Sequence, residues 1–420
     1  MKKLEENKYI YYLRRRARII FRWLVMGLIT GLTAGGFSCL LSYGVKYGTA
    51  FRGSHPWMLY LLPAAGLIIV FLYRRSGFTE DKGTNLVIQS VQSGEHLPWA
   101  MAPLILVSTV ITHLFGGSSG RESAGLQIGG SIGHNIGKLI GFAEEDQKTI
   151  TVCGMSAAFA ALFGTPMTAA FFAMELESVG IMYYASLIPC VVSALVASTL
   201  AKSIGLMPEI YAVKVIPELS AGRAAVTVAL AALCAGLSFL FCVTVHESGK
   251  LQKKYIENPY LRIAAGGALV VGITLLLGTR VYNGASLGLI EDSFAGEAPY
   301  EAFVLKLLLT AITLGAGYKG GEIVPSLCVG AAFGCSFARI TGFDPALCSA
   351  IGMTAMFCGV TNCPISSLLI SFELFGYEGM PYYLIAVAFS YALSGYHGLY
   401  SSQKIMYSKF HHRYVNRDTE

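Results

Sequence analysis

Long apolar segments recur along the whole chain and constrain its fold more than any other feature. Segment 181–201 does not alternate polar with apolar residues, so it does not fit a strand of a membrane β-barrel. Several segments are short or interrupted by glycine, which favours helices that stop partway through a bilayer. We therefore expect an all-α polytopic membrane protein. The apolar segments cover roughly residues 19–47, 57–73, 99–116, 150–176, 181–205, 222–248, 261–280, 301–316, 344–375 and 380–398.

The charge content supports this fold class. Charged residues make up 13% of the 420 residues and hydrophobic residues 54%, whereas a soluble domain has about 25% charged residues. The ten cysteines include no CxxC pair, so neither a zinc site nor a redox motif is indicated. We expect no metal and no nucleotide cofactor.

Both ends of the chain are basic. Residues 1–23 mix Lys and Arg with apolar residues, and we expect them to form a basic amphipathic helix on the cytoplasmic face of the lipid bilayer. Residues 401–420 are basic as well and form a second cytoplasmic segment. By the positive-inside rule both termini of this cell-membrane protein are cytoplasmic. The net charge of +6 is thus an orientation signal, and the sequence shows no soluble basic face for nucleic acid.

An internal repeat divides the membrane part into two halves, 24–210 and 211–400. The stretch "GMSAAFAALFGTPMTAAFFAMEL" (154–176) aligns with "GMTAMFCGVTNCPISSLLISFEL" (352–374), with the spacing from Gly to Pro and from Pro to Glu preserved. A glycine-rich loop precedes the repeated block in each half. Two similar halves with broken helices are typical of a transporter whose site lies between the halves.

Three loops have residues suited to holding an anion: 83–85, 120–122 and 320–324. The first N–H groups of a helix are unpaired and carry partial positive charge, so a helix that begins inside the membrane favours an anion at its start. Two charges, Arg121 and Glu122, lie in the second loop. Charged residues at membrane depth usually have a function.

Four short motifs resemble those of the CLC family of chloride channels and anion/proton exchangers, and the resemblance extends over nearly the whole chain. "GRESA" (120–124) stands where the family has G-[KR]-E-G-P, and "GGEIVP" (320–325) stands where it has G-x-F-x-P. "GTNLV" (83–87) stands where the family has G-S-G-I-P, and "GLYS" (398–401) is similar to its helix-R tyrosine motif. The order and spacing of the motifs carry more weight than any one of them.

Four residues depart from these motifs, and they are relevant to which anion is transported. They are Thr84 for Ser, Ser123 for Gly, Ala124 for Pro and Ile323 for Phe. The strings "THLFGGSSGRE" and "KGGEIVP" are most similar to the fluoride/proton exchanging branch of the family. The resemblance therefore implies transport of chloride or another halide, with a fluoride/proton antiporter as the alternative.

The resemblance also implies roles for single residues. Glu122 would be the gate, a carboxylate that occupies the anion site and leaves it when protonated; the alternative is a structural ion pair with Arg121. Thr84 and Tyr400 would donate hydroxyl groups to the anion, although a helix cap and an interfacial aromatic are the ordinary roles of such residues. The remaining residues expected around the anion are Asn85, Gly120, Arg121, Ile323 and Val324.

Carboxylates elsewhere are less clearly functional. We expect Glu175 and Glu373 to be structural, satisfied by neighbouring backbone N–H groups. Leu176 falls where the family's exchangers carry an internal proton glutamate, so an inner proton route would need water or Glu177. Glu322 has no counterpart in the chloride motif, and its role stays open with a structural role slightly favoured. His113 and His134 are expected to be satisfied polar groups.

The resemblance implies a CLC-type inverted two-repeat fold with broken helices, about 17–18 helices in all, that forms a homodimer. The sequence favours neither of two other functional classes, an intramembrane enzyme and a scaffold protein. An intramembrane enzyme is not supported, because His246-Glu247 lacks the second histidine of HExxH at Lys250, and "GGSSGRES" has Arg where a P-loop needs Lys. A scaffold protein would have no pathway of buried polar groups.

Overall fold

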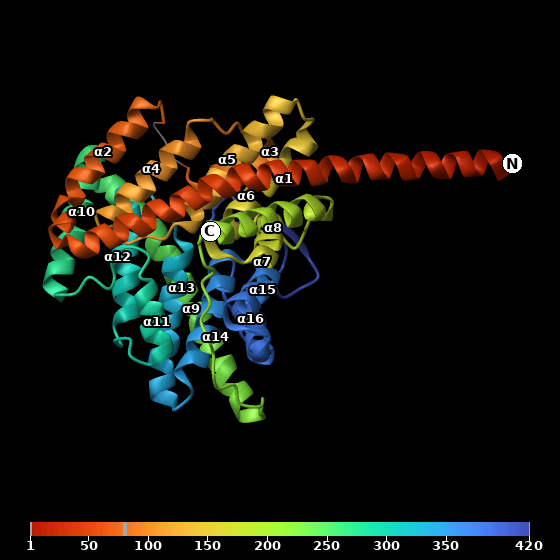
Figure 1. Cartoon of the computed structure of the whole chain (residues 1–420). Coiled ribbons are helices and arrows are strands. Elements are labelled where there is room, and N and C mark those ends of the chain that lie inside the picture. Colours follow the sequence, from red (N-terminus) through yellow and green to blue (C-terminus); the bar gives the residue numbers. More distant parts are fainter. Residues whose placement is uncertain (1, 79–81, 420) are drawn as a thin grey trace.

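The computed structural model describes residues 2–78 and 82–419. Within them lie sixteen α-helices, three 3-10 helices and three short strands (Figure 1). The α-helices are α1 Lys2–Ser54, α2 Leu62–Arg75, α3 Thr84–Ser93, α4 Met101–Leu114, α5 Glu122–Ile140, α6 Glu144–Phe163, α7 Pro166–Glu175, α8 Leu187–Ser203, α9 Ala221–Tyr255, α10 Pro259–Leu277, α11 Leu287–Ala295, α12 Ala302–Ala316, α13 Ile323–Thr341, α14 Pro345–Thr361, α15 Pro364–Phe375 and α16 Met380–Leu393. The 3-10 helices are η1 Pro56–Leu61, η2 Tyr184–Ser186 and η3 Tyr377–Gly379.

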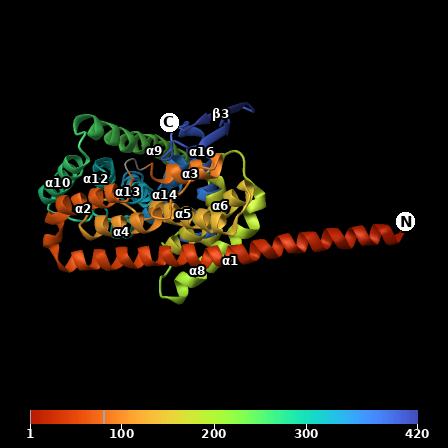
Figure 2. The ribbon, with the colours of Figure 1, turned by 90° about the horizontal axis from the view of Figure 1, so that it is seen from above.

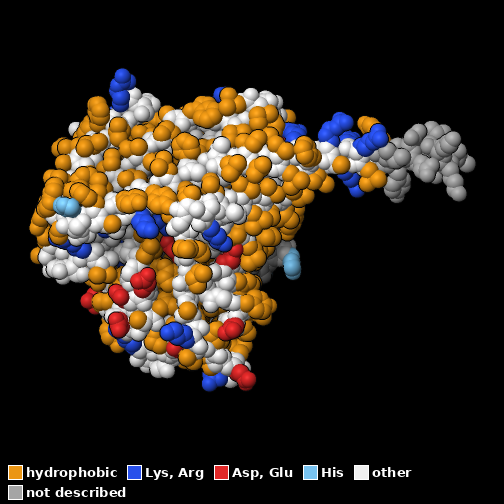
Figure 3. Space-filling model, in the orientation of Figure 1, with side chains coloured by type: hydrophobic (Ala, Val, Ile, Leu, Met, Phe, Trp, Pro, Cys, Tyr) orange, Lys and Arg blue, Asp and Glu red, His pale blue; other side chains and the backbone are white. Residues whose placement is uncertain are grey.

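The expected all-α membrane fold is confirmed: about 17–18 helices were expected, and the described residues form sixteen α-helices and three 3-10 helices. Six helical stretches of the described chain are long and apolar enough to cross a membrane. Others, such as α3 and α7, have ten residues each and rise only about 15 Å, half of a bilayer core. Figure 3 shows hydrophobic side chains covering most of one face of the molecule. Full-length spans and half-length helices thus occur together.

Helix α1 is longer than any bilayer is thick. Its 53 residues span about 80 Å, and its start projects away from the other helices (Figures 1 and 2). Helix α1 continues through the boundary expected at residue 23. No glycine or proline occurs from residue 9 to 26, so nothing in this part of the sequence ends the helix. Near this boundary Arg22 forms an ion pair of 2.6 Å with Asp146 and lies over the ring of Phe142.

The two halves repeat one helix crossing. Helix α5 packs against α6 in the first half, and α13 packs against α14 in the second. At the first crossing, a Cβ on Gly154 would lie 2.0 Å from the carbonyl oxygen of Gly129. At the second, a Cβ on Gly352 would lie 2.2 Å from that of Gly330. Only glycine lets the backbones approach so closely.

The end of the chain returns to the first half and forms a small sheet with it. Strand β2 (Lys404–Tyr407) pairs in parallel with β1 (Ser178–Val179) and antiparallel with β3 (Tyr414–Asp418). The hydroxyl of Thr419 also donates to the carbonyl oxygen of Tyr400. These bonds tie the end of the chain to the first half and fix the backbone of Tyr400.

Candidate anion pathway

The two glycine-rich loops meet between the halves. The backbone N–H of Gly120 donates to the carbonyl of Gly321 at 2.7 Å, and the N–H of Gly321 donates back at 2.6 Å. A Cβ on Gly321 would lie 2.9 Å from the backbone nitrogen of Glu122, so glycine is required for this approach. Helices α5 and α13 begin two residues after the paired glycines, which brings two positive helix ends together.

Glu122 is folded back over the start of its own helix. The residue is 1% exposed, and Oε2 accepts a hydrogen bond of 2.9 Å from the backbone N–H of Arg121. Oε1 lies 3.5 Å from Nε of Arg121. The carboxylate thus occupies donors at a helix start, which is where an anion would bind.

A cluster of hydroxyl groups lies next to Glu122. The hydroxyls of Ser123 and Tyr400 are 3.3 Å apart, and the backbone N–H of Glu322 donates to Oγ of Ser123 at 3.4 Å. Thr84 joins the cluster through a bond of 3.4 Å from its hydroxyl to the carbonyl of Ser123. Ser123 entered the sequence analysis only as a departure from a motif, yet it is the residue that connects the others.

The remaining predicted residues divide into two groups. Arg121, Ile323 and Val324 lie at the starts of α5 and α13, and both aliphatic side chains are buried. Asn85 lines the same cavity as Thr84, and its Oδ1 accepts from the backbone N–H of Ser402 at 2.9 Å. Its amide oxygen therefore fixes the loop that follows Tyr400.

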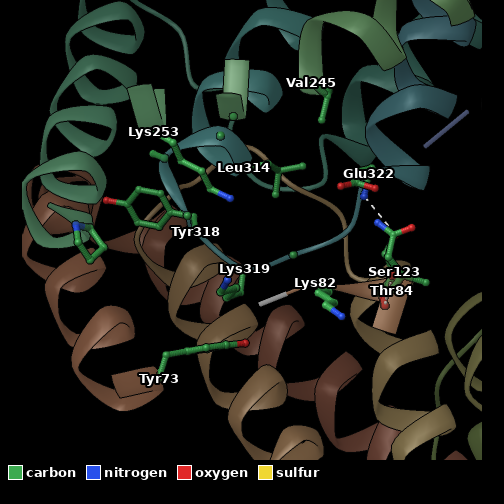
Figure 4. Close-up of a pocket in the computed structure, with 18 of the residues that line it drawn as sticks. Tyr73, Lys82, Thr84, Ser123, Val245, Lys253, Leu314, Tyr318, Lys319 and Glu322 are labelled. Atoms are coloured by element: carbon green, nitrogen blue, oxygen red, sulfur yellow. Dashed lines mark hydrogen bonds between the residues drawn. The ribbon is translucent and has the colours of Figure 1, made fainter. Parts of the chain in front are cut away.

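A cavity of about 920 Å³ leads to the hydroxyl cluster, and we call it the vestibule. Its inner end is lined by Thr84, Ser123, Glu322 and Tyr400. Figure 4 shows Lys82, Lys253 and Lys319 around it, together with the hydrogen bond between Glu322 and Ser123. A cavity lined with cations concentrates anions. The basic residues of the vestibule are Arg74, Lys82, Lys250, Lys253, Arg262 and Lys319.

Glu175 and Glu373 each bind the first turn of a helix in the opposite half. Glu175 accepts hydrogen bonds from the backbone N–H groups of Ile365 and Ser366, at 3.1 and 2.9 Å. Glu373 accepts from the N–H groups of Met167 and Thr168, at 3.0 and 2.8 Å. Both contacts satisfy helix N-termini that have no other cap.

Lys306 was missed by the sequence analysis. Its side chain is 0% exposed, and Nζ donates to Oγ of Ser118 at 3.0 Å and to the carbonyls of Tyr282 and Gly284 at 3.3 and 2.7 Å. These bonds hold the loop that leads to Gly120. A lysine inside the apolar segment 301–316 was the signal that could have found it.

The histidines differ from expectation in part. His134 interacts with Ser90 at 3.1 Å and with His96 at 3.4 Å. Nδ1 of His113 lies 2.9 Å from the carbonyl of Thr109, but its Nε2 has no partner within the described residues. The expectation of a fully satisfied His113 is therefore wrong, because its ring is enclosed where no acceptor or donor reaches the second nitrogen. Among the described residues, no three His, Cys, Asp or Glu side chains are grouped to hold a metal.

Comparison with known proteins decides the family. A family model described as "Voltage gated chloride channel" matches residues 65–395. This chain belongs to that family, the CLC family. It is a multi-pass membrane protein of a family of anion channels and transporters, and the expected CLC architecture is confirmed.

Several CLC relatives cover most of the chain. It is 33% identical over 402 residues to the "Chloride/fluoride channel protein" of Pseudomonas syringae pv. tomato, covering 94% of this chain and 88% of the relative. It is 25% identical over 394 residues to the "H(+)/Cl(-) exchange transporter ClcA" of Vibrio cholerae, covering 85% of this chain and 81% of the relative.

Solved CLC structures have the same fold. The crystal structure of a CLC-type fluoride/proton antiporter superimposes with a TM-score of 0.88 at 29% identity, covering 92% of this chain and 98% of the other. A slow cyanobacterial Cl⁻/H⁺ antiporter matches with a TM-score of 0.74 at 19% identity, covering 90% and 94%. The second likeness concerns the fold alone.

Proposed function

We propose that this protein exchanges fluoride for protons across the membrane, with Glu122 as the gate. The observation that carries the proposal is the position of the Glu122 carboxylate, which occupies a helix-start N–H beside the hydroxyls of Ser123 and Tyr400. A charged carboxylate and a permeant anion need the same donors, because both lack water at this depth. Only one of them binds at a time.

Protonation of Glu122 removes the competing charge. The neutral side chain releases the N–H of Arg121, and an anion from the vestibule takes its place. Hydroxyls of Thr84, Ser123 and Tyr400 then turn their protons toward the ion. The proton reaches Glu122 from the side opposite to the vestibule, and the anion leaves on that side. Glu122 then releases its proton toward the vestibule and returns to the helix start, so anion and proton cross in opposite directions.

The narrowness of the site supports fluoride as the preferred ion. The hydroxyl oxygens of Ser123 and Tyr400 are only 3.3 Å apart. An anion that binds between them must move them apart, and a small halide does so less than a large one. Fluoride also accepts stronger hydrogen bonds than chloride from such donors. The names of two relatives that match over most of the chain include fluoride.

Chloride is the second candidate, because the family model that matches residues 65–395 describes a chloride channel. A relative that exchanges protons for chloride, by its name, also covers 85% of the chain. The larger ion would need the two hydroxyls to move apart.

For the inner proton route we propose Glu322. Leu176 is fully buried and has no proton to carry. Glu322 is half-buried, lines the vestibule, and its carboxylate has no hydrogen-bond partner among the described residues. Its backbone N–H binds Ser123, the neighbour of the gate. Glu322 thus links the vestibule to Glu122, which favours a functional role over a structural one.

We further propose that both termini and the vestibule face the cytoplasm, and that the protein is a homodimer in the cell membrane. The orientation is supported by the basic residues at both ends of the chain. The dimer is supported by family membership.

Purified protein in liposomes tests the proposal. Fluoride efflux, chloride efflux and proton uptake are measured for native protein, Glu122→Gln and Glu322→Gln, with the exposed Glu378→Gln as the control. We expect native protein to move fluoride faster than chloride and to couple it to protons. Glu122→Gln keeps anion movement but loses coupling and pH dependence, and Glu322→Gln loses coupling. Unchanged rate, coupling and pH dependence in Glu122→Gln would refute the gate.

A further inference from the structure

One arginine lies between two carboxylates. Nη2 of Arg121 forms an ion pair of 2.9 Å with Oε1 of Glu209, while Nε of the same side chain lies 3.5 Å from Oε1 of Glu122. Nη2 also donates to the carbonyl of Leu162 at 3.3 Å. The gate and Glu209 therefore share a single positive charge.

Glu209 is held in a fixed place. It lies in the segment that joins the two halves, between α8 and α9. Its backbone N–H donates to the carbonyl of Phe163 at 3.4 Å. A Cβ on Gly164, whose φ is +74°, would lie 2.5 Å from Cβ of Pro208, so the segment rests directly on the end of α6. The side chain of Glu209 is only 15% exposed.

This segment lies away from the vestibule. The vestibule is lined by the last turns of α9, from Val245 onward, whereas the segment with Glu209 leads into the first turn of α9 at Ala221. Helix α9 has 35 residues and is about 52 Å long. Glu209 and Arg121 do not line the vestibule. The contacts of Arg121 with Glu122 and Glu209 therefore lie outside the vestibule lining.

We propose that Glu209 is a positioning residue that sets the pH at which the gate opens, by drawing Arg121 away from Glu122. The inference rests on the proposed function of Glu122. With Glu209 present, Arg121 interacts with two carboxylates and stabilises the charge of Glu122 less. The negative charge of Glu209 also repels that of Glu122. Both effects make Glu122 easier to protonate.

Removal of Glu209 should change the pH at which the gate opens in one direction. Arg121 then pairs with Glu122 alone, and the opposing negative charge is gone. The charged gate is stabilised, so more protons are needed to open it. Flux that rises as the pH falls should reach half of its maximum at a lower pH.

Other charged groups near these two carboxylates stay in place in such a variant. Glu291 of α11 and Tyr211 lie within electrostatic range of Glu209. Tyr400 lies within electrostatic range of both Glu122 and Glu322. Because none of these groups is altered in the variant, a shift in the pH of half-maximal flux can be assigned to the loss of Glu209.

The experiment is a pH profile of anion efflux from liposomes with equal pH on both sides. Glu209→Gln should move the half-maximal pH down by about one unit, which is tenfold in proton concentration. Glu209→Asp keeps the charge and should restore most of the native profile. Glu218→Gln, an exposed glutamate of the same segment, should leave the profile unchanged. The double variant Glu122→Gln/Glu209→Gln should behave as Glu122→Gln alone.

The outcomes separate the two proposals. If Glu122→Gln keeps a native pH profile, the gate itself is wrong. If Glu122→Gln abolishes the pH dependence but Glu209→Gln leaves the midpoint unchanged, or moves it up, the gate stands and the role of Glu209 is wrong. A fall in flux at every pH with an unchanged midpoint would show that Glu209 only stabilises the fold.

Discussion

Glu175 and Glu373 cap each other's helices: each carboxylate accepts hydrogen bonds from the first turn of the helix that carries the other. Glu175, at the end of α7, binds the start of α15, and Glu373, in the last turn of α15, binds the start of α7. The two helices thus form an antiparallel pair tied at both ends. Because one glutamate belongs to each half of the chain, these bonds fasten the halves together.

The first prediction follows from this arrangement. Glu175→Ala leaves the N–H groups of Ile365 and Ser366 without acceptors inside the protein, which should cost about 2–3 kcal/mol of folding free energy. Thermal unfolding in detergent measures the loss. Glu378→Ala, at an exposed glutamate just beyond α15, is the control. An equal melting temperature for both variants would contradict the structural role.

A second prediction concerns Lys306. Lys306→Met keeps the length of the side chain but removes the donor that binds Ser118 and Gly284. We expect a loss of about 1–3 kcal/mol in unfolding free energy, because a buried carbonyl is left unpaired. Lys202→Met, at an exposed lysine, should be neutral. Native stability of Lys306→Met would mean that the loop before Gly120 needs no such anchor.

The crossing of α5 and α6 gives a third prediction. In Gly129→Ala the new methyl group would lie 2.1 Å from the carbonyl oxygen of Gly154. A flexible side chain could rotate away from such a clash, but the backbone of a helix cannot. A loss of about 3 kcal/mol or more is expected, with a lower yield of folded protein on size-exclusion chromatography. Gly236→Ala adds the same methyl group where no atom lies within 4 Å, and it should fold normally.

The vestibule gives a fourth prediction. Lys253→Gln removes a cation from its wall, so anion flux at low ionic strength should fall about twofold or more. The difference should shrink in about 1 M of an impermeant salt, where charges are screened within about 3 Å. Lys254→Gln, at the next residue but outside the vestibule lining, is the control. A defect that persists at high salt would contradict electrostatic attraction.

The sequence predicted the parts of the site that depend on local pattern. Glycine-rich loops before helices and the alignment of 154–176 with 352–374 placed the loops 116–133 and 317–334 at equivalent points of the two halves. From this the meeting of these loops could be expected, and the structure shows it in the paired backbones of Gly120 and Gly321.

Contacts between distant segments were beyond that reasoning. Nothing in the spacing around Glu209 indicates that it reaches Arg121, because the approach depends on how the linking segment lies against Phe163 and Gly164. The same holds for Glu175, whose partners belong to the opposite half. Local periodicity shows which face of a helix is apolar, but it does not name the partner.

The pairing of β1 with β2 has a consequence for biosynthesis. Ser178 and Val179 emerge from the ribosome early, but their partners Lys404 and Ile405 follow more than two hundred residues later. At about 5–20 residues per second, the strand waits on the order of tens of seconds for its neighbour. The backbone of Tyr400 is fixed later still, when Thr419 arrives. The backbone contacts around Tyr400 are therefore completed only after residue 419 has been made, which is later than the synthesis of every helix that lines the vestibule.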